Sequence, residues 1–283
     1  NRSSAMSTSL TPSDVAIEPR QPAFDLRGAL GTDWNGGDPF KTAFFNALSL
    51  TFPIGEKYFI DSVRGFEKEL ADSKLKREVR GFIGQEAVHR REHRKYNEML
   101  CAARAYDDAT FQRDLQARID DRDDLSRFTR LLETVTFEHL TAILAHGLLT
   151  DERWLGDADK TMAQLWRWHA IEEAEHKAVA FDVYRAAGGD MERLRLALPL
   201  VTKQMLTDIL QGTWMMLKTD GRHLDPSVWA RGLNWLFGPN GVMWSLKGQW
   251  RAFRQDGFHP WNHDNRDVIS DWKAAGEPEL LAA

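Results

Sequence analysis

The sequence contains one cysteine, Cys101, and no long apolar run among its 283 residues. A single cysteine excludes an intrachain disulfide and a zinc site built from several thiolates, and it fits a reducing, cytoplasmic location. No stretch approaches the roughly 18 to 20 apolar residues of a transmembrane span, and the first residues lack the apolar centre of a secretion signal. We therefore expect a soluble, cytoplasmic protein without a transmembrane span.

Clustered positive charge and strand patterns are also scarce. The formal net charge is −5, and the basic residues are spread along the chain rather than gathered into a run. This distribution gives no reason to expect nucleic acid as a partner. No segment shows convincing strand alternation, an internal repeat or low complexity, so the predicted fold is all-α.

The chain is predicted to form one helical domain preceded by an arm. Residues 1–37 are polar and turn-rich, which indicates a flexible arm rather than a packed element. Residues 38–283 form the single domain, with accessory C-terminal helices within 190–257 and a tail. Apolar residues recur at helical spacing over 40–70, 75–103, 124–149, 159–187, 191–218, 226–236 and 242–255. The intervening segment 104–121 reads as a charged crossover with some helical character.

Each of the first four long helices carries a glutamate in its apolar stripe. These glutamates are Glu56, Glu86, Glu138 and Glu173. In the fourth helix, His169, Glu173 and His176 stand at i, i+4 and i+7 and therefore share one face. Polar groups in a buried stripe cost several kcal/mol unless a partner satisfies them, and a metal ion is the best single partner for this pattern. A buried polar network without metal is the alternative, although so many groups are hard to satisfy together.

The four glutamates are predicted to lie at one level, because residues at one level of an antiparallel hairpin are mirrored about its turn. Glu56 and Glu86 have their midpoint at position 71, in a predicted turn. Glu138 and Glu173 have theirs between positions 155 and 156, in a second predicted loop. At about 1.5 Å per residue, each pair lies roughly 22 to 26 Å from its turn. Glu86 and Glu138 are mirrored about position 112, inside the crossover, so all four carboxylates can meet.

This arrangement is that of ferritin-like four-helix bundles with a dinuclear site, which use a lone glutamate from each of two helices and Glu-x-x-His from each of the other two. The lone glutamates are Glu56 and Glu138, and the Glu-x-x-His pairs are Glu86/His89 and Glu173/His176. Mixed carboxylate and imidazole ligands suit iron or manganese. The predicted cofactor is therefore two Fe ions, with Mn or a mixed Fe/Mn pair as the alternative.

The chain resembles a known family through these motifs. Glu56, Gln85-Glu86-x-x-His89 and His169-x-x-x-Glu173-x-x-His176 are similar to the pattern of the ferritin-like proteins labelled predicted metal-dependent hydrolases. The resemblance extends from the first long helix to Phe258-His259-Pro260-Trp261, although the residues themselves give no chemical basis for the word hydrolase. The site also resembles di-iron arylamine N-oxygenases, whose pattern has a histidine four residues before the second Glu-x-x-His. That similarity implies His169 as a third histidine ligand, whereas the residues alone also allow an outer position or packing on Trp166.

Two further residues are predicted to lie beside the ligands. His93 stands one turn beyond His89 on the same helix face, and a hydrogen-bonded position outside the ligand set is favoured over ligation. Glu172 lies at the edge of its stripe, which indicates an outer or surface position.

Tryptophan is unusually frequent, with 11 residues, seven of them in the C-terminal third. Their helical spacing favours core packing of accessory helices over a lipid or substrate surface, so peripheral membrane contact is the less favoured alternative. These helices either cap the bundle and line a pocket or form a homodimer.

The main hypothesis for function is an O₂-activating di-iron oxidase or oxygenase, with O₂ and a small apolar organic molecule as substrates. The alternative is a metal-dependent hydrolase that uses a metal-activated water. Non-catalytic iron binding is a third possibility, against which the histidine content of the site argues. No catalytic residue is assigned beyond the metal ligands.

Overall fold

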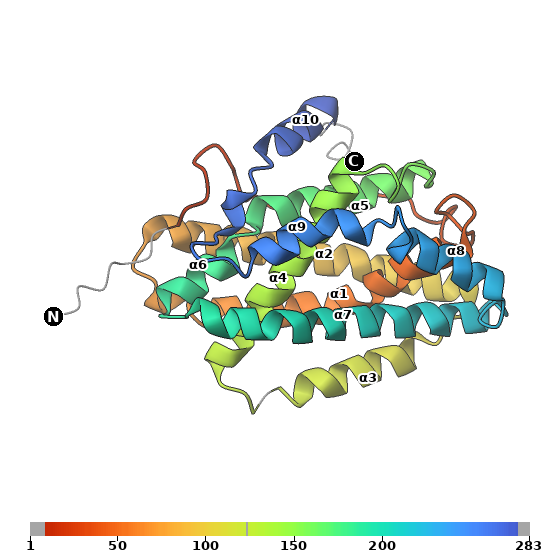
Figure 1. Ribbon diagram of the computed structural model, residues 1–283, viewed down its shortest axis with the longest axis horizontal. Coiled ribbons are helices and arrows are strands. Elements are labelled where there is room, and N and C mark those ends of the chain that lie inside the picture. The colour runs from red at the N-terminus through yellow and green to blue at the C-terminus, as the bar shows by residue number, and fades with distance from the viewer. Residues whose placement is uncertain (1–8, 123, 277–283) are drawn as a thin grey trace.

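The computed structural model describes residues 9–122 and 124–276, and this part of the chain is all-α, as predicted. Most of its helices follow the long axis of the molecule, with α10 at one edge and α3 at the opposite edge (Figure 1). The helices are α1 (Pro39–Arg64), α2 (Ser73–Arg104), α3 (Asp108–Asp120), α4 (Arg127–Thr150), α5 (Lys160–His176), α6 (Val179–Ala186), α7 (Met191–Thr219), α8 (Pro226–Phe237), α9 (Met243–Ala252) and α10 (Arg266–Gly276). Short 3-10 turns lie at Glu67–Glu69 and Pro260–Asn262.

Two helical hairpins, α1 with α2 and α4 with α5, form the centre of the fold. Short connections join the members of each pair, which therefore run antiparallel. The side chains of Asp38, Asp72 and Asp159 accept the first free backbone N–H groups of α1, α2 and α5, so each helix begins at a capping residue. Since α1 also packs against α4, the two hairpins meet along their inner faces.

Pro53 lies inside α1 and changes its hydrogen bonding one turn before Glu56. Proline has no backbone N–H, so the carbonyl of Ser49, four residues earlier, loses its helical donor. The side-chain amide of Asn97 on α2 donates to this carbonyl at 3.0 Å. The proline thus creates an acceptor that ties α1 to α2.

The predicted fourth helix over 159–187 is two helices in the structure. α5 ends at His176 and α6 begins at Val179, although the backbone between them keeps right-handed helical angles. Lys177 Nζ donates to the backbone carbonyl of His263 at 2.6 Å and to Asn265 Oδ1 at 2.7 Å. The residue at the break therefore contacts a segment far along the chain. The local sequence pattern does not encode this contact.

Residues 9–37 differ from the predicted flexible arm because they pack against the helices. They contain no helix, but Leu30 and Trp34 are only 1% and 4% exposed. Trp34 Nε1 donates to Asn46 Oδ1 on α1 at 3.0 Å. Prolines and turn residues prevent helix and strand formation but do not prevent burial. A lack of regular structure therefore does not imply a flexible arm. Residues 1–8 of the predicted arm lie outside the described residues.

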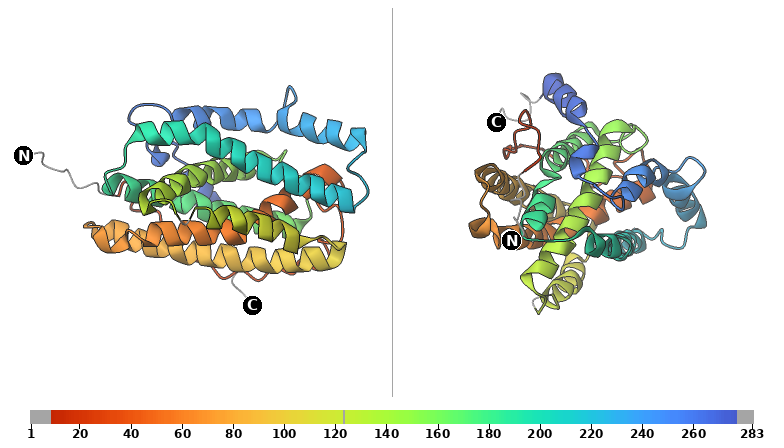
Figure 2. Two further views of the ribbon diagram at one scale, coloured as in Figure 1. Left: turned by 90° about the horizontal axis from the view of Figure 1, so that it is seen from below. Right: turned by 60° about the vertical axis from the view of Figure 1, so that its left-hand side comes forward.

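The C-terminal helices α7, α8 and α9 gather on one side of the bundle, with α2 on the opposite side (Figure 2). Trp229 and Trp235 of α8 pack edge-on against Phe40 and Phe44 of α1, with ring centroids 5.5 and 5.4 Å apart. These tryptophans pack against the core, as favoured from the sequence, whereas Trp244 of α9 is 50% exposed.

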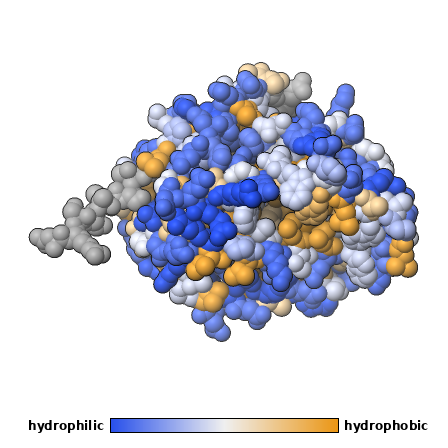
Figure 3. Space-filling view, viewed as in Figure 1, coloured by the Kyte–Doolittle hydropathy of each residue, from blue (hydrophilic) through white to orange (hydrophobic). Residues whose placement is uncertain are grey.

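Apolar side chains gather on the face of α7–α9, on a surface that is otherwise largely hydrophilic (Figure 3). No described helix combines the length and apolarity needed to cross a bilayer. α10, which the sequence analysis did not predict, lies beside α5.

A glycine on α8 provides a test of how closely this helix approaches α1. A Cβ at Gly232 would lie 2.1 Å from Cγ of the fully buried Phe40. We expect Gly232→Ala to lower the free energy of unfolding by about 1–3 kcal/mol, because overpacking outweighs the gain in helix propensity. Gly248→Ala on α9, where a Cβ would meet nothing within 4 Å, is the matched control and should be neutral or slightly stabilising. Urea unfolding followed by circular dichroism measures both, and equal stabilities would contradict the close approach.

Candidate metal centre

Four helices bring seven ionisable side chains to one buried point. One group contains Glu56, His89 and His169, and the other contains Glu86, Glu138, Glu173 and His176. Within each group the candidate ligand atoms lie within 4.8 Å of one another, and every member is buried. The structure therefore places all seven sequence-predicted ligands in one centre, with contributions from α1, α2, α4 and α5.

Glu173 connects the two groups. Its Oε1 lies 3.2 Å from His169 Nε2 and 3.6 Å from both His89 Nδ1 and His176 Nε2. His176 Nε2 in turn lies 3.1 Å from Glu86 Oε1. Because one carboxylate oxygen is close to three imidazole nitrogens, Glu173 is the residue best placed to contact ions in both groups.

Several carboxylate oxygens in the centre have no hydrogen-bond partner of good geometry in the described part of the chain. Both oxygens of Glu56, Glu86 and Glu138 are in this position, as is Oε2 of Glu173. These four residues are at most 4% exposed. Ionised carboxylates left unpaired in the interior cost several kcal/mol each. Two divalent cations would offset four negative charges, so the donor set fits a dinuclear centre.

The pKa values of these groups follow from burial and crowding. Burial, reinforced by neighbouring carboxylates, raises the pKa of Glu56 and Glu138 well above the usual range. Burial also raises the pKa of Glu86 to about 7. For Glu173, burial acts in the same direction, but the adjacent imidazoles outweigh it and hold the pKa below its usual range. Protons and metal ions therefore compete for the same oxygens.

Polar side chains lie against the outer nitrogens of two of the three imidazoles, by a hydrogen bond for His176 and by close contact for His89. His176 Nδ1 donates to Gln85 Oε1 at 3.0 Å, while Gln85 Nε2 donates to Glu175 Oε2 at 2.8 Å, which fixes the orientation of the amide. His89 Nε2 lies 3.0 Å from Glu172 Oε2. Burial lowers the pKa of His89, whereas for His176 burial is outweighed by Glu173 and the neighbouring carboxylates, which raise its pKa, so metal binding at His176 would displace a proton. In the neutral form, His176 would carry its proton on Nδ1 toward Gln85 and present Nε2 to the centre, and His89 would present Nδ1.

A chain of polar groups orients the third imidazole, His169. Because Asn97 Nδ2 donates to the Ser49 carbonyl, its Oδ1 accepts the Ser49 hydroxyl at 2.7 Å. Ser49 Oγ then accepts from His93 Nδ1 at 2.8 Å, and His93 Nε2 accepts from His169 Nδ1 at 2.8 Å. Burial lowers the pKa of His93 and keeps it neutral. The chain leaves His169 Nε2 unprotonated on the side of the centre.

The N-terminal segment places a buried cation beside the outer layer, the side chains that lie behind the candidate ligands, such as Glu172 and Gln85. Arg20, 8% exposed, donates to the two carboxylate oxygens of Glu175 at 2.7 and 2.8 Å. Its backbone N–H and its guanidinium also donate to Glu172 Oε1, at 3.0 and 3.2 Å. Lys273 of α10 lies 3.0 Å from Glu175. Segments near both ends of the described chain thus converge on α5 behind the candidate ligands.

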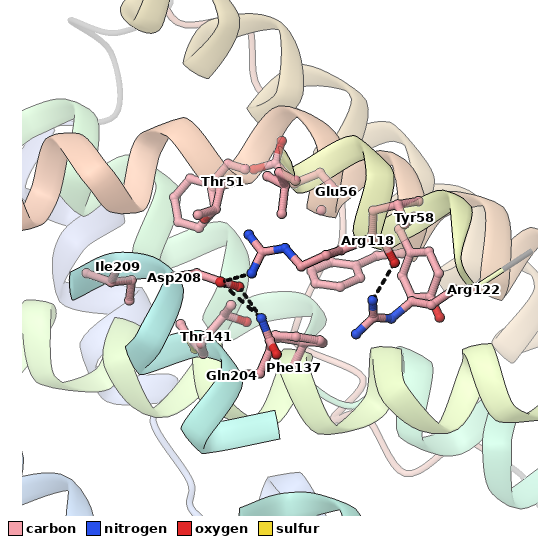
Figure 4. Close-up of a pocket in the computed structure, with 16 residues that line it drawn as sticks. Thr51, Glu56, Tyr58, Arg118, Arg122, Phe137, Thr141, Gln204, Asp208 and Ile209 are labelled. Atoms are coloured by element: carbon pink, nitrogen blue, oxygen red, sulfur yellow. Dashed lines mark hydrogen bonds and ion pairs between the residues drawn. The ribbon is translucent and has the colours of Figure 1, made fainter. Parts of the chain in front are cut away.

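A cavity of about 80 Å³ lies beside the centre, between α1, α3, α4 and α7 (Figure 4). Glu56 belongs both to the candidate ligands and to the cavity wall. Phe52, also in the wall, stacks on His169 with 4.7 Å between ring centroids. The cavity therefore adjoins the candidate ligands.

The two residues predicted to lie beside the ligands, His93 and Glu172, contact the outer nitrogens of His169 and His89. The sequence analysis assigned no role to Gln85 and did not find Arg20. Gln85 directly precedes Glu86 in the quoted motif, which was an available signal. Arg20 had none, because its partners lie 152 and 155 residues away along the chain.

Comparison with known families finds a match over residues 18–264 to a family described as "Predicted metal-dependent hydrolase". The matched range includes every residue of the candidate centre and also Arg20. No curated protein and no solved structure matches the chain.

Replacing Arg20 by glutamine should destabilise the protein and weaken metal binding. Glu172 and Glu175 would stay buried without their main cationic partner, a loss that costs about 3–5 kcal/mol in buried pairs. The imidazole oriented by Glu172 would be held less firmly, which lowers metal affinity about 10- to 100-fold. Arg27→Gln is the matched control, because Arg27 in the same segment pairs with Asp25 at the surface. Denaturant unfolding and competition with a chelating dye measure the two effects, and an unchanged metal affinity would contradict the outer-layer role.

Proposed function

The chain belongs to the family of predicted metal-dependent hydrolases, and on this basis we propose that it hydrolyses a small organic substrate with metal held at the buried centre. The observation that carries the proposal is the convergence of four carboxylates and three imidazoles on one buried point. Their unpaired oxygens and inward-facing nitrogens form a donor set that a metal would satisfy.

One set of residues would bind the metal, and a second set would position these ligands. One ion would be held by Glu56, His89 and His169 and the other by Glu86, Glu138 and His176, with Glu173 shared between them. When bound, divalent ions supply Lewis acidity and lower the pKa of a coordinated water. The outer partners keep the imidazole nitrogens directed inward, and the buried surroundings exclude bulk water. Glu56 lines the cavity, although its carboxylate oxygens are buried away from it, so the reacting group of the substrate would approach the centre from this side.

Two iron ions are the proposed cofactor, with manganese or a mixed pair as the alternative. The donors are carboxylate oxygens and imidazole nitrogens, which suit these metals. Thiolate, which often accompanies structural zinc, is absent from the centre, since the chain has one cysteine and Cys101 is not among the candidate ligands.

The shared position of Glu173 leads to a prediction about metal content. Glu173→Ala should bind fewer than two ions per chain while keeping its helical content, because it removes the carboxylate that contacts both groups. Elemental analysis of the protein after reconstitution with Fe(II) or Mn(II) measures the stoichiometry, and circular dichroism measures the helix content. Glu98→Ala on the exposed side of α2 is the control and should bind like wild type. Two ions per chain in the Glu173 variant would rule out this assignment.

O₂ activation by a di-iron centre is a second candidate function. The observation that favours it is the third imidazole, His169, whose Nε2 lies 3.2 Å from Glu173 on the side of the centre. The substrates would then be O₂ and a small apolar molecule, whereas the family description favours hydrolysis.

The metal requirement separates these functions. We expect protein reconstituted anaerobically with Mn(II) or Zn(II) to hydrolyse uncharged aryl esters such as p-nitrophenyl acetate, since hydrolysis needs Lewis acidity rather than redox chemistry. The Glu173→Ala variant should lose about 100-fold or more in kcat/KM, beyond the 10- to 100-fold typical of outer-partner loss. Turnover that requires Fe(II) and consumes O₂ would favour the oxygenase, and metal uptake without either reaction would leave non-catalytic iron binding.

A further inference from the structure

The wall of the cavity beside Glu56 contains a glycine at a helix position where a larger side chain would fit. Gly55 lies inside α1 and lines the cavity. A Cβ at this position would have a single neighbour within 4 Å, the ring of Phe59 at 4.0 Å, so no steric conflict excludes a side chain. Glycine inside a helix is about 0.5–1 kcal/mol less favourable than alanine. The missing side chain therefore keeps space open next to a candidate metal ligand.

Apart from Glu56, the charged side chains that line the cavity, Arg118, Arg122 and Asp208, are already paired. Arg118 of α3 forms an ion pair with Asp208 of α7, and Gln204 donates to the same carboxylate at 3.0 Å (Figure 4). Arg122 Nε lies 3.0 Å from Glu133 Oε2. An anionic ligand would have to break one of these pairs or be buried without a counter-charge, and a buried unpaired charge is strongly unfavourable.

The rest of the wall is largely apolar. Its main apolar side chains are Phe52, Phe59, Leu115, Phe137, Met205 and Ile209. Such a surface favours aromatic and aliphatic groups, with few polar contacts to fix orientation. Glu56 belongs to this wall but its carboxylate oxygens are buried, so a reacting carbonyl would meet the centre only after the wall beside Glu56 shifts.

We propose, as an extension that rests on the proposed function, that this cavity is the substrate site and that it selects an uncharged ester or amide with a compact aromatic or aliphatic body. Paired charges and apolar walls disfavour phosphate esters and substrates with a free carboxylate. Gly55 provides the space in which the ester or amide group reaches the candidate ligands.

α3 forms one wall of the cavity, and a shift of α3 would enlarge it for such a molecule. The cavity volume of about 80 Å³ is smaller than the roughly 150 Å³ of an engineered cavity that binds benzene. The buried apolar side chains among the described ones of α3 are Phe111 and Leu115, each 8% exposed. An element with so few buried contacts opens at low free-energy cost. The ion pair of Arg118 with Asp208 therefore acts as a latch that holds α3 over the cavity.

Two non-reactive probes test the site and its preference for uncharged ligands. Acetophenone imitates an aryl ester but has no bond to hydrolyse, and 4-acetylbenzoate adds a single carboxylate to it. Isothermal titration calorimetry on the full-length protein, with its metal content recorded, should show acetophenone binding at least about tenfold more tightly than the anion, because the carboxylate would be buried unpaired. Equal or tighter binding of 4-acetylbenzoate would overturn the uncharged class.

Filling the cavity tests its location. Gly55→Leu should reduce acetophenone affinity at least about tenfold, because the new side chain occupies the space beside Glu56. Gly248→Leu, at an exposed helical glycine of α9, is the matched control and should bind like wild type. Unchanged circular dichroism and metal content would show that the fold and the centre are intact. Wild-type acetophenone affinity in folded Gly55→Leu protein would overturn the assignment.

The latch is tested by association rates. Arg118→Gln should speed acetophenone binding in stopped-flow fluorescence by up to about fivefold, the range expected for a partly exposed ion pair. Arg113→Gln is the control on the same helix, since Arg113 donates to Thr110 of α3 itself, at the exposed surface. Equal rates in wild type and both variants would overturn the latch.

These outcomes separate the cavity inference from the proposed function. Acetophenone binding that depends on Gly55, in protein that hydrolyses no ester with any metal, would support the cavity as a ligand site and count against hydrolysis. Ester hydrolysis that is unaffected by Gly55→Leu would support the proposed function and overturn the cavity as its substrate site.

Discussion

The structure depends on the cost of burying four carboxylates at one point. Glu56, Glu86, Glu138 and Glu173 come from four different helices, and each is nearly inaccessible to water. Four ionised groups at such separations repel one another and lose their hydration, so the packing of the two hairpins is favourable only if protons or cations neutralise them. The raised pKa values of Glu56 and Glu138 reflect this cost. Metal binding and helix packing are therefore coupled at this site.

The residues behind the candidate ligands fix the orientation of each imidazole, so that one ring nitrogen faces the centre. Pro53 exposes the Ser49 carbonyl, Asn97 satisfies it, and the resulting hydrogen-bond chain passes through His93 to His169. On the other side, Gln85 and Glu172 meet the outer nitrogens of His176 and His89. Fixed outer partners leave little freedom for ligand rotation, which favours binding of metal in one geometry.

The same donor set is compatible with hydrolysis and with O₂ chemistry, so function depends on what reaches Glu56. The adjoining cavity is small and largely apolar, and its charged side chains other than Glu56 are paired. These properties limit the ligand by size and charge rather than through specific hydrogen bonds. The space left by Gly55 and the cover provided by α3 are thus as relevant to the reaction as the metal ligands.

The sequence by itself determined the all-α class, most helix positions and the set of candidate ligands. It could do so because helical periodicity is local, and because a glutamate in an apolar stripe is visible without tertiary contacts. The mirrored positions of Glu56 and Glu86 needed only the location of one turn. Only the tertiary structure decided that residues near Arg20 pack behind α5, that the predicted fourth helix breaks after His176, and that a cavity opens beside Gly55. Each of these depends on contacts between segments far apart in the chain, such as Arg20 with Glu175, and no local pattern encodes which distant partner a buried charge will find.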